Sequence, residues 1–465
     1  MVHTYLPNLQ IPKGSRVILY GAGENGLKVY DQIVAMNWCD ILAVLDKNYA
    51  RMDDFPATVQ PPEAIVEYTG YDYVIITITS IPVAEDVEKY LFGLGVDSES
   101  ILFAYKCFAY SPMVVNTDCE PHAGKHKILL RIQGAIGDNV ISLAFYEAVA
   151  RLADKSVIDI WGEGQWYVKH VFFGLPNLGK VLEKTNESTS LGYDVIIELR
   201  FAAKLIQYNE ASTRESAPQL AEAIDKLFAL QKTDMVDLHV FQYANRVLVN
   251  RAKFLGLNRY TLMDWGGIFG IDSKNVSLFI RDGAESHFAE LRLPQKYITF
   301  NYGAANPLHS EKPQTKQWLP EYHAELNRLL KQQFPDIEII QTGSKDVIKI
   351  KGADRYILGE DLEVTKVILK NALCHFDCEG GLVHIATQLG TKCFVVFGPT
   401  PIWFLGYEQN TNIAPKICGE CKGLIPDWYT RCYKGYDIPA CMLSIKPDEV
   451  FELMKSYLEK KVDRQ

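Results

Sequence analysis

The sequence predicts an α/β protein made of three Rossmann-like units in series. Short apolar strands alternate with helical segments along the chain, a pattern typical of parallel sheets. A glycine turn follows a strand in each unit, at Gly21, Gly134 and Gly380. The 465 residues also exceed what one hydrophobic core can organise. We therefore expect three domains, which span residues 1–122, 126–292 and 296–465.

The composition is that of an ordinary globular protein, with 48% hydrophobic and 23% charged residues. The net charge of −9 argues against a nucleic-acid partner, because no basic excess is present to neutralise phosphates. No apolar run reaches the roughly 18 to 20 residues that span a bilayer, so we expect no transmembrane segment. The first residues lack the apolar core of a signal peptide, which predicts a cytoplasmic location. The oligomeric state, including a homo-oligomer, stays open.

The first unit carries the dinucleotide-binding fingerprint. A buried strand ends at Tyr20, the turn Gly21-x-Gly23-x-x-Gly26 opens a helix, and the next strand ends at Asp46. In one interpretation, the glycines admit a nucleotide diphosphate and Asp46 holds a ribose. In the other, the unit serves interaction or stability and the glycines serve only the tight turn, since Rossmann-like sheets host many unrelated roles.

The second unit begins after a polar stretch, Asn116 to Lys125, which we expect to be a linker. The strand Lys127–Ile132 leads into Gly134, Gly137 and Asp138, and an apolar helical pattern follows. The turn places Asp138 at the start of this helix.

The third unit contains the most informative stretch of the chain, which runs from residue 377 to 407. Gly380 and Gly381 form a turn that opens a helix, and such a turn offers free backbone N–H groups and a positive dipole end to a diphosphate. The apolar strand 393–397 then ends at Gly398-Pro399-Thr400, at the edge where open α/β sheets bind ligands. Two Rossmann-like domains that face a cleft make the GT-B arrangement, and this half is expected to hold a nucleotide sugar.

From about residue 126 onward, the chain resembles the ADP-heptose-type heptosyltransferases of glycosyltransferase family 9, which include bacterial autotransporter heptosyltransferases. The resemblance rests on four blocks in the family's order: residues 128–140, 316–320, 379–400 and 441–450. It implies a GT-B glycosyltransferase preceded by a third Rossmann-like domain. The first unit lies outside this resemblance and is similar to Rossmann-like modules found beside bacterial polysaccharide glycosyltransferases.

The resemblance assigns two catalytic residues. Asp138 matches the family's general base, a carboxylate that removes the proton of the acceptor hydroxyl during inverting transfer. Its structural alternative is a helix N-cap, a favoured use of aspartate. Lys316 matches the lysine that stabilises the leaving nucleoside diphosphate. The alternative for Lys316 is a solvated side chain beside Trp318, whose ring we expect in the core.

The donor-binding residues follow from the same comparison. Glu379, Gly380 and Gly381 stand where many family members have Asp-Ser/Thr-Gly, which leaves the identity of the sugar nucleotide in doubt. His384 matches the family histidine, either as a donor to phosphate or a sugar hydroxyl or as a buried structural residue. Three further residues would close the other side of the pocket: Gly398, Pro399 and Thr400. No DxD motif lies in a suitable loop, so we expect metal-independent catalysis.

Four of the ten cysteines cluster in the tail, in the pattern C-x2-C-x10-C-x8-C. Four cysteines, two of them in a CxxC motif, can provide the four ligands of a tetrahedral zinc or iron site. Some protein-modifying heptosyltransferases similar to this family carry iron on a comparable set. The cysteines are therefore expected to hold a structural Fe or Zn or, alternatively, to be reduced structural thiols: Cys418, Cys421, Cys432 and Cys441.

The predicted function is an inverting glycosyltransferase that moves a heptose or related sugar from a nucleotide diphosphate, with ADP-heptose favoured. The acceptor would be a bacterial glycan, such as lipopolysaccharide, or a protein. The alternative is a nucleotide- or partner-binding assembly or regulatory subunit of a polysaccharide pathway, with weak transferase activity. A third reading, an NAD-dependent oxidoreductase built on the Gly21 turn, lacks a recognisable hydride-handling site.

Overall fold

The computed structural model describes residues 2–9, 11–36, 39–78, 81–104, 108–117, 125–162, 166–182, 192–231, 241–302, 314–425 and 428–462. The chain divides into two compact units. The N-terminal unit comprises residues 3–117 with 229–244, and the C-terminal unit comprises the first two residues, 118–228 and 245–465. Most of the predicted linker, Asn116 to Lys125, lies outside the described residues.

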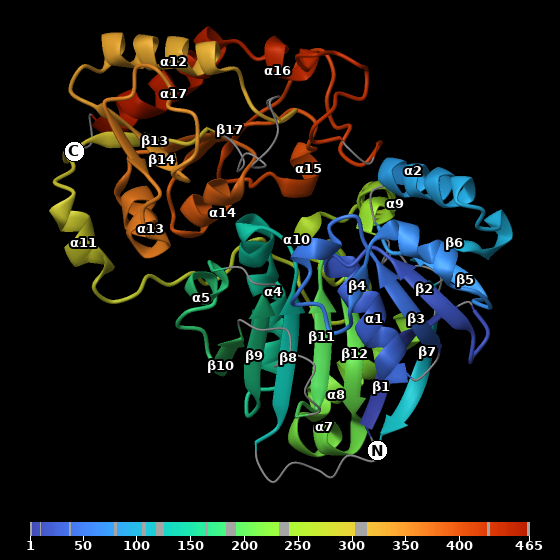
Figure 1. Cartoon of the computed structure of the whole chain (residues 1–465). Helices are drawn as coiled ribbons and strands as arrows, with labels where there is room; N and C mark the ends of the chain where they lie inside the picture. Colours follow the sequence, from blue (N-terminus) through green and yellow to red (C-terminus); the bar gives the residue numbers. More distant parts are fainter. Residues whose placement is uncertain are drawn as a thin grey trace. The chain divides into compact units, whose positions relative to one another are not determined.

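The N-terminal unit is built on a parallel sheet with the strand order β4-β3-β2-β5-β6 (Figure 1). The first strand of the unit to enter this sheet, β2, lies at its centre, which is the order of a Rossmann-like sheet. The elements of this part of the chain are β1 Val2–Leu9, β2 Arg16–Tyr20, α1 Glu24–Met36, β3 Asp40–Leu45, η1 Tyr49–Arg51, β4 Val59–Gln60, η2 Pro62–Glu67, β5 Tyr73–Ile76, α2 Ile81–Gly93, η3 Ser98–Ser100, β6 Ile101–Phe103 and β7 Phe108–Thr117.

The first half of the C-terminal unit, residues 125–292, carries strands in the order β10-β9-β8-β11-β12. Strands β8, β9, β10 and β11 run parallel, and β12 pairs antiparallel with β11. The elements of this half are β8 Lys127–Ile132, α4 Ile136–Leu152, β9 Val157–Gly162, α5 Val168–Val171, β10 Leu178–Leu182, β11 Val195–Leu199, β12 Ala203–Asn209, α7 Glu210–Ser216, α8 Pro218–Gln231, α9 Phe241–Leu255, α10 Arg259–Met263 and α11 Ala284–Glu290.

The second half of the C-terminal unit, residues 296–462, is built on an entirely parallel sheet in the order β15-β14-β13-β16-β17-β18. Its core is formed by apolar side chains that include Phe300, Trp318, Phe376 and Met442, so the expected packing of Trp318 is confirmed. The elements are β13 Tyr297–Phe300, α12 Pro320–Gln333, β14 Glu338–Gly343, β15 Arg355–Leu358, α13 Leu362–Asn371, β16 His375–Cys378, α14 Gly381–Gln388, β17 Cys393–Val396, α15 Ile402–Leu405, β18 Thr411–Ile413, α16 Ala440–Ser444 and α17 Pro447–Val462.

These topologies confirm the predicted fold class: an α/β chain with two Rossmann-like sheets in the GT-B arrangement and a third before them. Strand β12 was not predicted, because Lys204 and Gln207 interrupt its apolar residues. Among the helices of the described residues, none is long and apolar enough to cross a membrane.

His323 lies inside a box of aromatic rings in the core of the second half. The rings of Phe300, Tyr302, Trp318 and Phe376 are steeply inclined to the imidazole, with centroids 5.1 to 6.4 Å away. Within the part of the chain that the structure describes, neither ring nitrogen of His323 has a hydrogen-bond partner. Burial lowers the pKa of this histidine to about 3. The imidazole is therefore neutral in the folded protein at neutral pH.

Replacing His323 with phenylalanine should stabilise the fold, because the change removes an unsatisfied polar group from an apolar box. The unfolded chain takes up the proton near the ordinary pKa of 6.5, whereas the folded chain takes it up only near 3. The stability that depends on the neutral imidazole is thus present above pH 6.5 and is lost as the pH falls toward 3. The advantage of His323→Phe should therefore grow by roughly 2 kcal/mol between about pH 7 and pH 5.

Denaturant unfolding at both pH values measures this difference. The control variant is His287→Gln, at an exposed histidine of α11. Its free energy of unfolding should depend on pH as that of the wild type does. An equal advantage of His323→Phe at both pH values would contradict the burial of a neutral imidazole.

Candidate functional site

The N-terminal ends of helices α4 and α14 meet where the two halves of the C-terminal unit face each other (Figure 1). A Cβ atom on Gly381 would lie 2.0 Å from the side chain of Ile136, and one on Gly137 would lie 2.8 Å from the His384 ring. Glycine is therefore required at both positions by the close approach of the helices. Because α4 follows β8 and α14 follows β16, both helices start beside the point where the strand order of their sheet reverses. Ligands of open α/β sheets bind at this point.

Asp138 lies in the first turn of α4 and keeps 36% of its side chain exposed. Its Oδ2 accepts a hydrogen bond from the backbone N–H of Ala135 at 3.2 Å, and its Oδ1 accepts one from Arg259 Nη2 at 3.1 Å. The N-cap of α4 is Ala135, so the expectation that Asp138 itself is the N-cap is wrong. The aspartate binds the backbone of the cap from the third helical position, and this contact fixes a partly exposed carboxylate at the junction.

Arg259 is a site residue that the sequence analysis missed. It begins α10, is only 2% exposed, and donates to both Asp138 and the carbonyl of Arg200. Its guanidinium lies over the Phe201 ring, 4.7 Å from the centroid. Arg259 Nη1 is buried and has no hydrogen-bond partner among the described residues. No local pattern marks this arginine, although Asn258 before it caps α10 through its side chain.

Lys316 and Glu379 form a buried ion pair on the side of the second half. Lys316 Nζ lies 3.4 Å from Glu379 Oε2, and the hydroxyl of Thr400 donates to the same oxygen at 3.1 Å. Burial alone would raise the pKa of Glu379, but the charges of Lys316 and Lys422 outweigh it and hold this pKa at about 2. Glu379 therefore stays ionised and positions Lys316. Its predicted role in binding the donor stays a prediction.

His384 connects the two halves through a chain of buried hydroxyl groups. Its Nδ1 lies 2.6 Å from the hydroxyl oxygen of Tyr407, which lies 2.7 Å from the hydroxyl oxygen of Tyr260. Tyr260 follows Arg259 on α10, so the chain reaches from the second half to the first. Burial lowers the pKa of His384 to about 4 against the opposing charges of Glu379 and Asp138. The imidazole is neutral at neutral pH.

The orientation of Gln388 fixes the direction of these hydrogen bonds. Its Oε1 accepts from the N–H of Val276 at 3.0 Å, and its Nε2 donates to the carbonyl of Lys274 at 2.7 Å and to Tyr260 at 3.4 Å. Tyr260 thus accepts from Gln388 and gives its own proton to Tyr407, which in turn donates to His384 Nδ1. In the opposite direction, the buried hydroxyl proton of Tyr260 would have no acceptor among the described residues. His384 therefore carries its proton on Nε2, the nitrogen beside Gly137.

The remaining predicted donor residues lie around this junction in different ways. Gly380 is the N-cap of α14, with an extended backbone that does not itself require glycine. Gly398 does require it, because a Cβ there would lie 2.3 Å from the sulfur of Met442. The carbonyl of Pro399 accepts a hydrogen bond from the N–H of Lys422 at 2.8 Å. The loop after β17 is thus covered by the cysteine-rich tail.

The four tail cysteines are free thiols, and they lie near enough for the charge of one to affect the pKa of another. The pKa of Cys441 is raised to about 12, first by burial and then by the neighbouring charges of Cys418, Cys421 and Cys432. Within the described residues, however, no group of three or more His, Cys, Asp or Glu side chains is arranged to hold a metal ion. The arrangement of the cysteines therefore does not show the predicted metal, and we derive no chemical step from it.

In the N-terminal unit, the contacts of Asp46 are those of a structural residue. Its two carboxylate oxygens accept hydrogen bonds from the backbone N–H groups of Ala22 and Asn48, at 2.8 and 2.7 Å. A Cβ on Gly26 would lie 1.9 Å from the carbonyl oxygen of Gly21, so this glycine serves the tight turn. These contacts favour the structural interpretation of the fingerprint.

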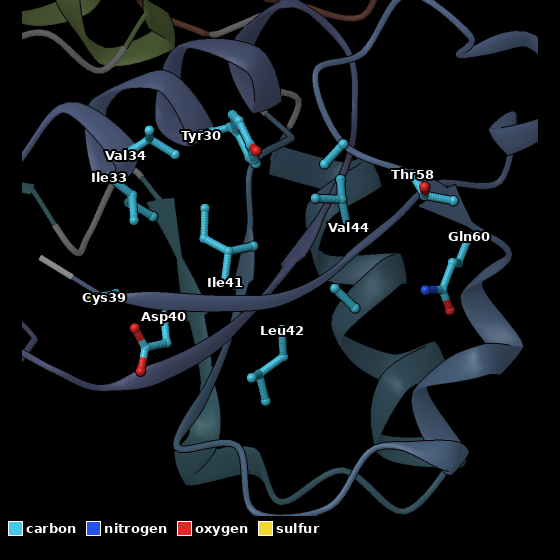
Figure 2. A pocket seen from close by; sticks show the side chains of 12 residues that line it. Tyr30, Ile33, Val34, Cys39, Asp40, Ile41, Leu42, Val44, Thr58 and Gln60 are labelled. Carbon is cyan, nitrogen blue, oxygen red and sulfur yellow. The ribbon is translucent and has the colours of Figure 1, made fainter. Parts of the chain in front are cut away.

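A cavity of about 500 Å³ in the same unit lies away from the glycine turn. Figure 2 shows side chains of α1 and β3 on its wall, among them Tyr30, Ile33 and Ile41. Neither the fingerprint glycines nor Asp46 line it. The cavity therefore adds no support to a dinucleotide site.

The fold is that of a GT-B α/β protein, and its site combines two helix ends with two ion pairs, Asp138 with Arg259 and Glu379 with Lys316. No protein-family model matches the chain, and a search of the curated proteins gives no match. Among solved structures, the chain is similar to the ADP-heptose LPS heptosyltransferase II of E. coli, with 17% identity and a TM-score of 0.47 over 72% of this chain and 99% of that one.

A glycosyltransferase of family 9 from Veillonella parvula is similar at 14% identity and a TM-score of 0.45, over 72% of this chain and 97% of that one. The iron-containing dodecameric glycosyltransferase TibC from enterotoxigenic E. coli is similar at 11% identity and a TM-score of 0.44, over 76% of this chain and 80% of that one. The similar structures thus include heptosyltransferases and a family 9 enzyme, the group that the sequence motifs resemble. The likeness is one of fold.

Proposed function

We propose that this protein is an inverting glycosyltransferase that uses a nucleotide-diphosphate sugar. The observation that carries the proposal is the arrangement around Asp138. Its partly exposed carboxylate, held by Arg259, lies at the start of α4, where this helix meets the start of α14. A general base on one side and phosphate-binding groups on the other are what sugar transfer between two bound substrates requires.

In the proposed reaction, the acceptor hydroxyl gives its proton to Asp138 while its oxygen attacks the anomeric carbon of the donor. The bond between that carbon and the phosphate oxygen breaks, and the nucleoside diphosphate leaves with the bonding electrons. Lys316, positioned by Glu379, stabilises the negative charge as it develops on the leaving group. His384 would donate its Nε2 proton to the donor. With cations in these roles, transfer needs no metal ion.

The donor favoured by the sequence motifs is ADP-heptose, and the acceptor is a bacterial glycan or protein. A thermal-shift screen of nucleotide sugars tests the donor. We expect ADP-heptose to raise the melting temperature more than UDP- or GDP-sugars do, because a ligand that binds only the folded state stabilises it. Release of the nucleoside diphosphate in the presence of acceptor fractions then measures transfer.

If another nucleotide sugar raised the melting temperature more than ADP-heptose does, the proposed glycosyltransferase activity would stand and that nucleotide sugar would be its donor. The absence of both a shift and transfer with every nucleotide sugar would contradict the proposal and favour the assembly-subunit alternative. Elemental analysis of the same preparation tests the separate prediction of iron or zinc on the tail cysteines.

A further inference from the structure

The cysteine-rich tail lies directly on the loop that follows β17. The backbone N–H of Glu420 donates to the carbonyl of Gly398 at 3.1 Å, and that of Lys422 donates to Pro399 at 2.8 Å. Gly419 and Glu420 have φ values of 155° and 54°, so the tail turns sharply at this contact. The charge of Lys422 is one of those that lower the pKa of Glu379.

The tail is also tied to the loop that carries Lys316. The hydroxyl of Thr315 donates to the carbonyl of Trp428 at 2.7 Å, and the N–H of Thr315 donates to Tyr429 at 3.0 Å. One stretch of the tail therefore contacts both loops that would surround the donor phosphates. A contact of this kind fixes Lys316 and Lys422 relative to each other.

The ammonium group of Lys422 rests between two aromatic rings. Its Nζ lies 5.5 Å from the centroid of the Phe404 ring and 5.1 Å from that of Trp428. It makes no hydrogen bond or ion pair within the described part of the chain. An ammonium group has three N–H donors, so the rings hold the charge in place while its hydrogen-bonding capacity stays unused.

The charges at the junction are not balanced. The carboxylate of Asp138 is paired with Arg259, and that of Glu379 is paired with Lys316. Lys422 is thus a cation beyond the two paired ones. Glu379 directly precedes Gly380, the N-cap of α14, and the N-terminus of this helix also favours negative charge. An anion with more than one negative charge is the ligand that would complete this set.

We propose that Lys422 binds the diphosphate of the donor together with Lys316, and that the cysteine-rich tail positions it for this role. The inference rests on the proposed function and deepens it. Lys422 contributes a charge-assisted hydrogen bond to the leaving group, and the cysteines act through the loop that carries the lysine.

The test measures binding of inorganic pyrophosphate by calorimetry, together with nucleoside diphosphate release in the transferase assay. Lys422→Met should weaken pyrophosphate binding roughly 10- to 100-fold, the size of one charge-assisted hydrogen bond. Lys422→Arg should keep most of the affinity, because it keeps the charge. The salt dependence of binding should be shallower for Lys422→Met than for the wild type.

Lys434→Met is the matched control, since Lys434 is an exposed lysine of the same tail. It should bind pyrophosphate as the wild type does. The proposed role of Lys422 would be overturned if Lys422→Met bound pyrophosphate with the affinity and salt dependence of the wild type while Lys316→Met bound it more weakly. A wild-type protein that binds pyrophosphate but transfers no sugar would instead overturn the proposed function. The melting temperatures of all variants show whether a variant has lost pyrophosphate binding or has lost its fold. If Lys422→Met is unstable, Lys422→Arg still tests the role of the charge.

Discussion

Asp138→Asn should reduce sugar transfer by roughly 10²- to 10⁴-fold, the usual contribution of a general base. An asparagine oxygen can still accept the hydrogen bond from the N–H of Ala135, so the start of α4 keeps its cap. The amide cannot take the proton of the acceptor hydroxyl, so the substitution should mainly lower kcat. Because Arg259 loses its anionic partner and is only 2% exposed, a lowered melting temperature should accompany the loss of activity.

The control for this experiment is Asp154→Asn, which makes the same chemical change at an exposed aspartate just after the end of α4. This variant should transfer sugar at the wild-type rate. Donor binding by Asp138→Asn, followed in the thermal-shift assay, should stay close to that of the wild type. Undiminished transfer by a folded Asp138→Asn protein would remove Asp138 from the mechanism.

Lys316→Met should lower transfer by roughly 10²- to 10³-fold, the range for loss of one group that stabilises developing charge. Methionine keeps much of the length and apolar body of the side chain, so the packing around Trp318 should survive. Without its ion-pair partner, the buried carboxylate of Glu379 keeps only the charge of Lys422 and the hydrogen bond from Thr400, and its pKa should rise from about 2. The variant should therefore unfold more readily as well as react more slowly.

Steady-state kinetics with the preferred donor, together with thermal unfolding, measure both effects. Lys316→Arg should retain part of the activity, because it keeps a cation at the leaving group. Lys370→Met, at the exposed C-terminal end of α13, should behave as the wild type. If Lys316→Met lost stability but transferred sugar normally, the lysine would be a structural partner of Glu379 only.

Local patterns in the sequence predicted the central strands of the sheets, the glycine turns and the positions of Asp138 and His384. These features can be predicted from the sequence because each depends on residues close to one another in the chain. The glycine pair Gly137 and Gly381 shows the limit. Both were predicted as turn residues, yet the structure requires them because two helices from different halves approach each other.

The residues that the sequence analysis missed act through partners far away in the chain. Arg259 and Asp138 are 121 residues apart, and Tyr260 and Tyr407 are 147 residues apart. No periodicity or spacing rule links such positions, because they meet only when the sheets are assembled. Glu379 illustrates the same point, since Lys316, the partner of its carboxylate, lies 63 residues away in the chain.

The close approach of Gly137 and Gly381 limits where the substrates can lie. A Cβ atom on Gly381 would already overlap the side chain of Ile136, so the space between these two positions does not admit even a methyl group. Donor and acceptor would therefore bind beside the helix ends, where Asp138 is partly exposed, and not between them. A side chain at position 381 would have to displace Ile136 from the start of α4.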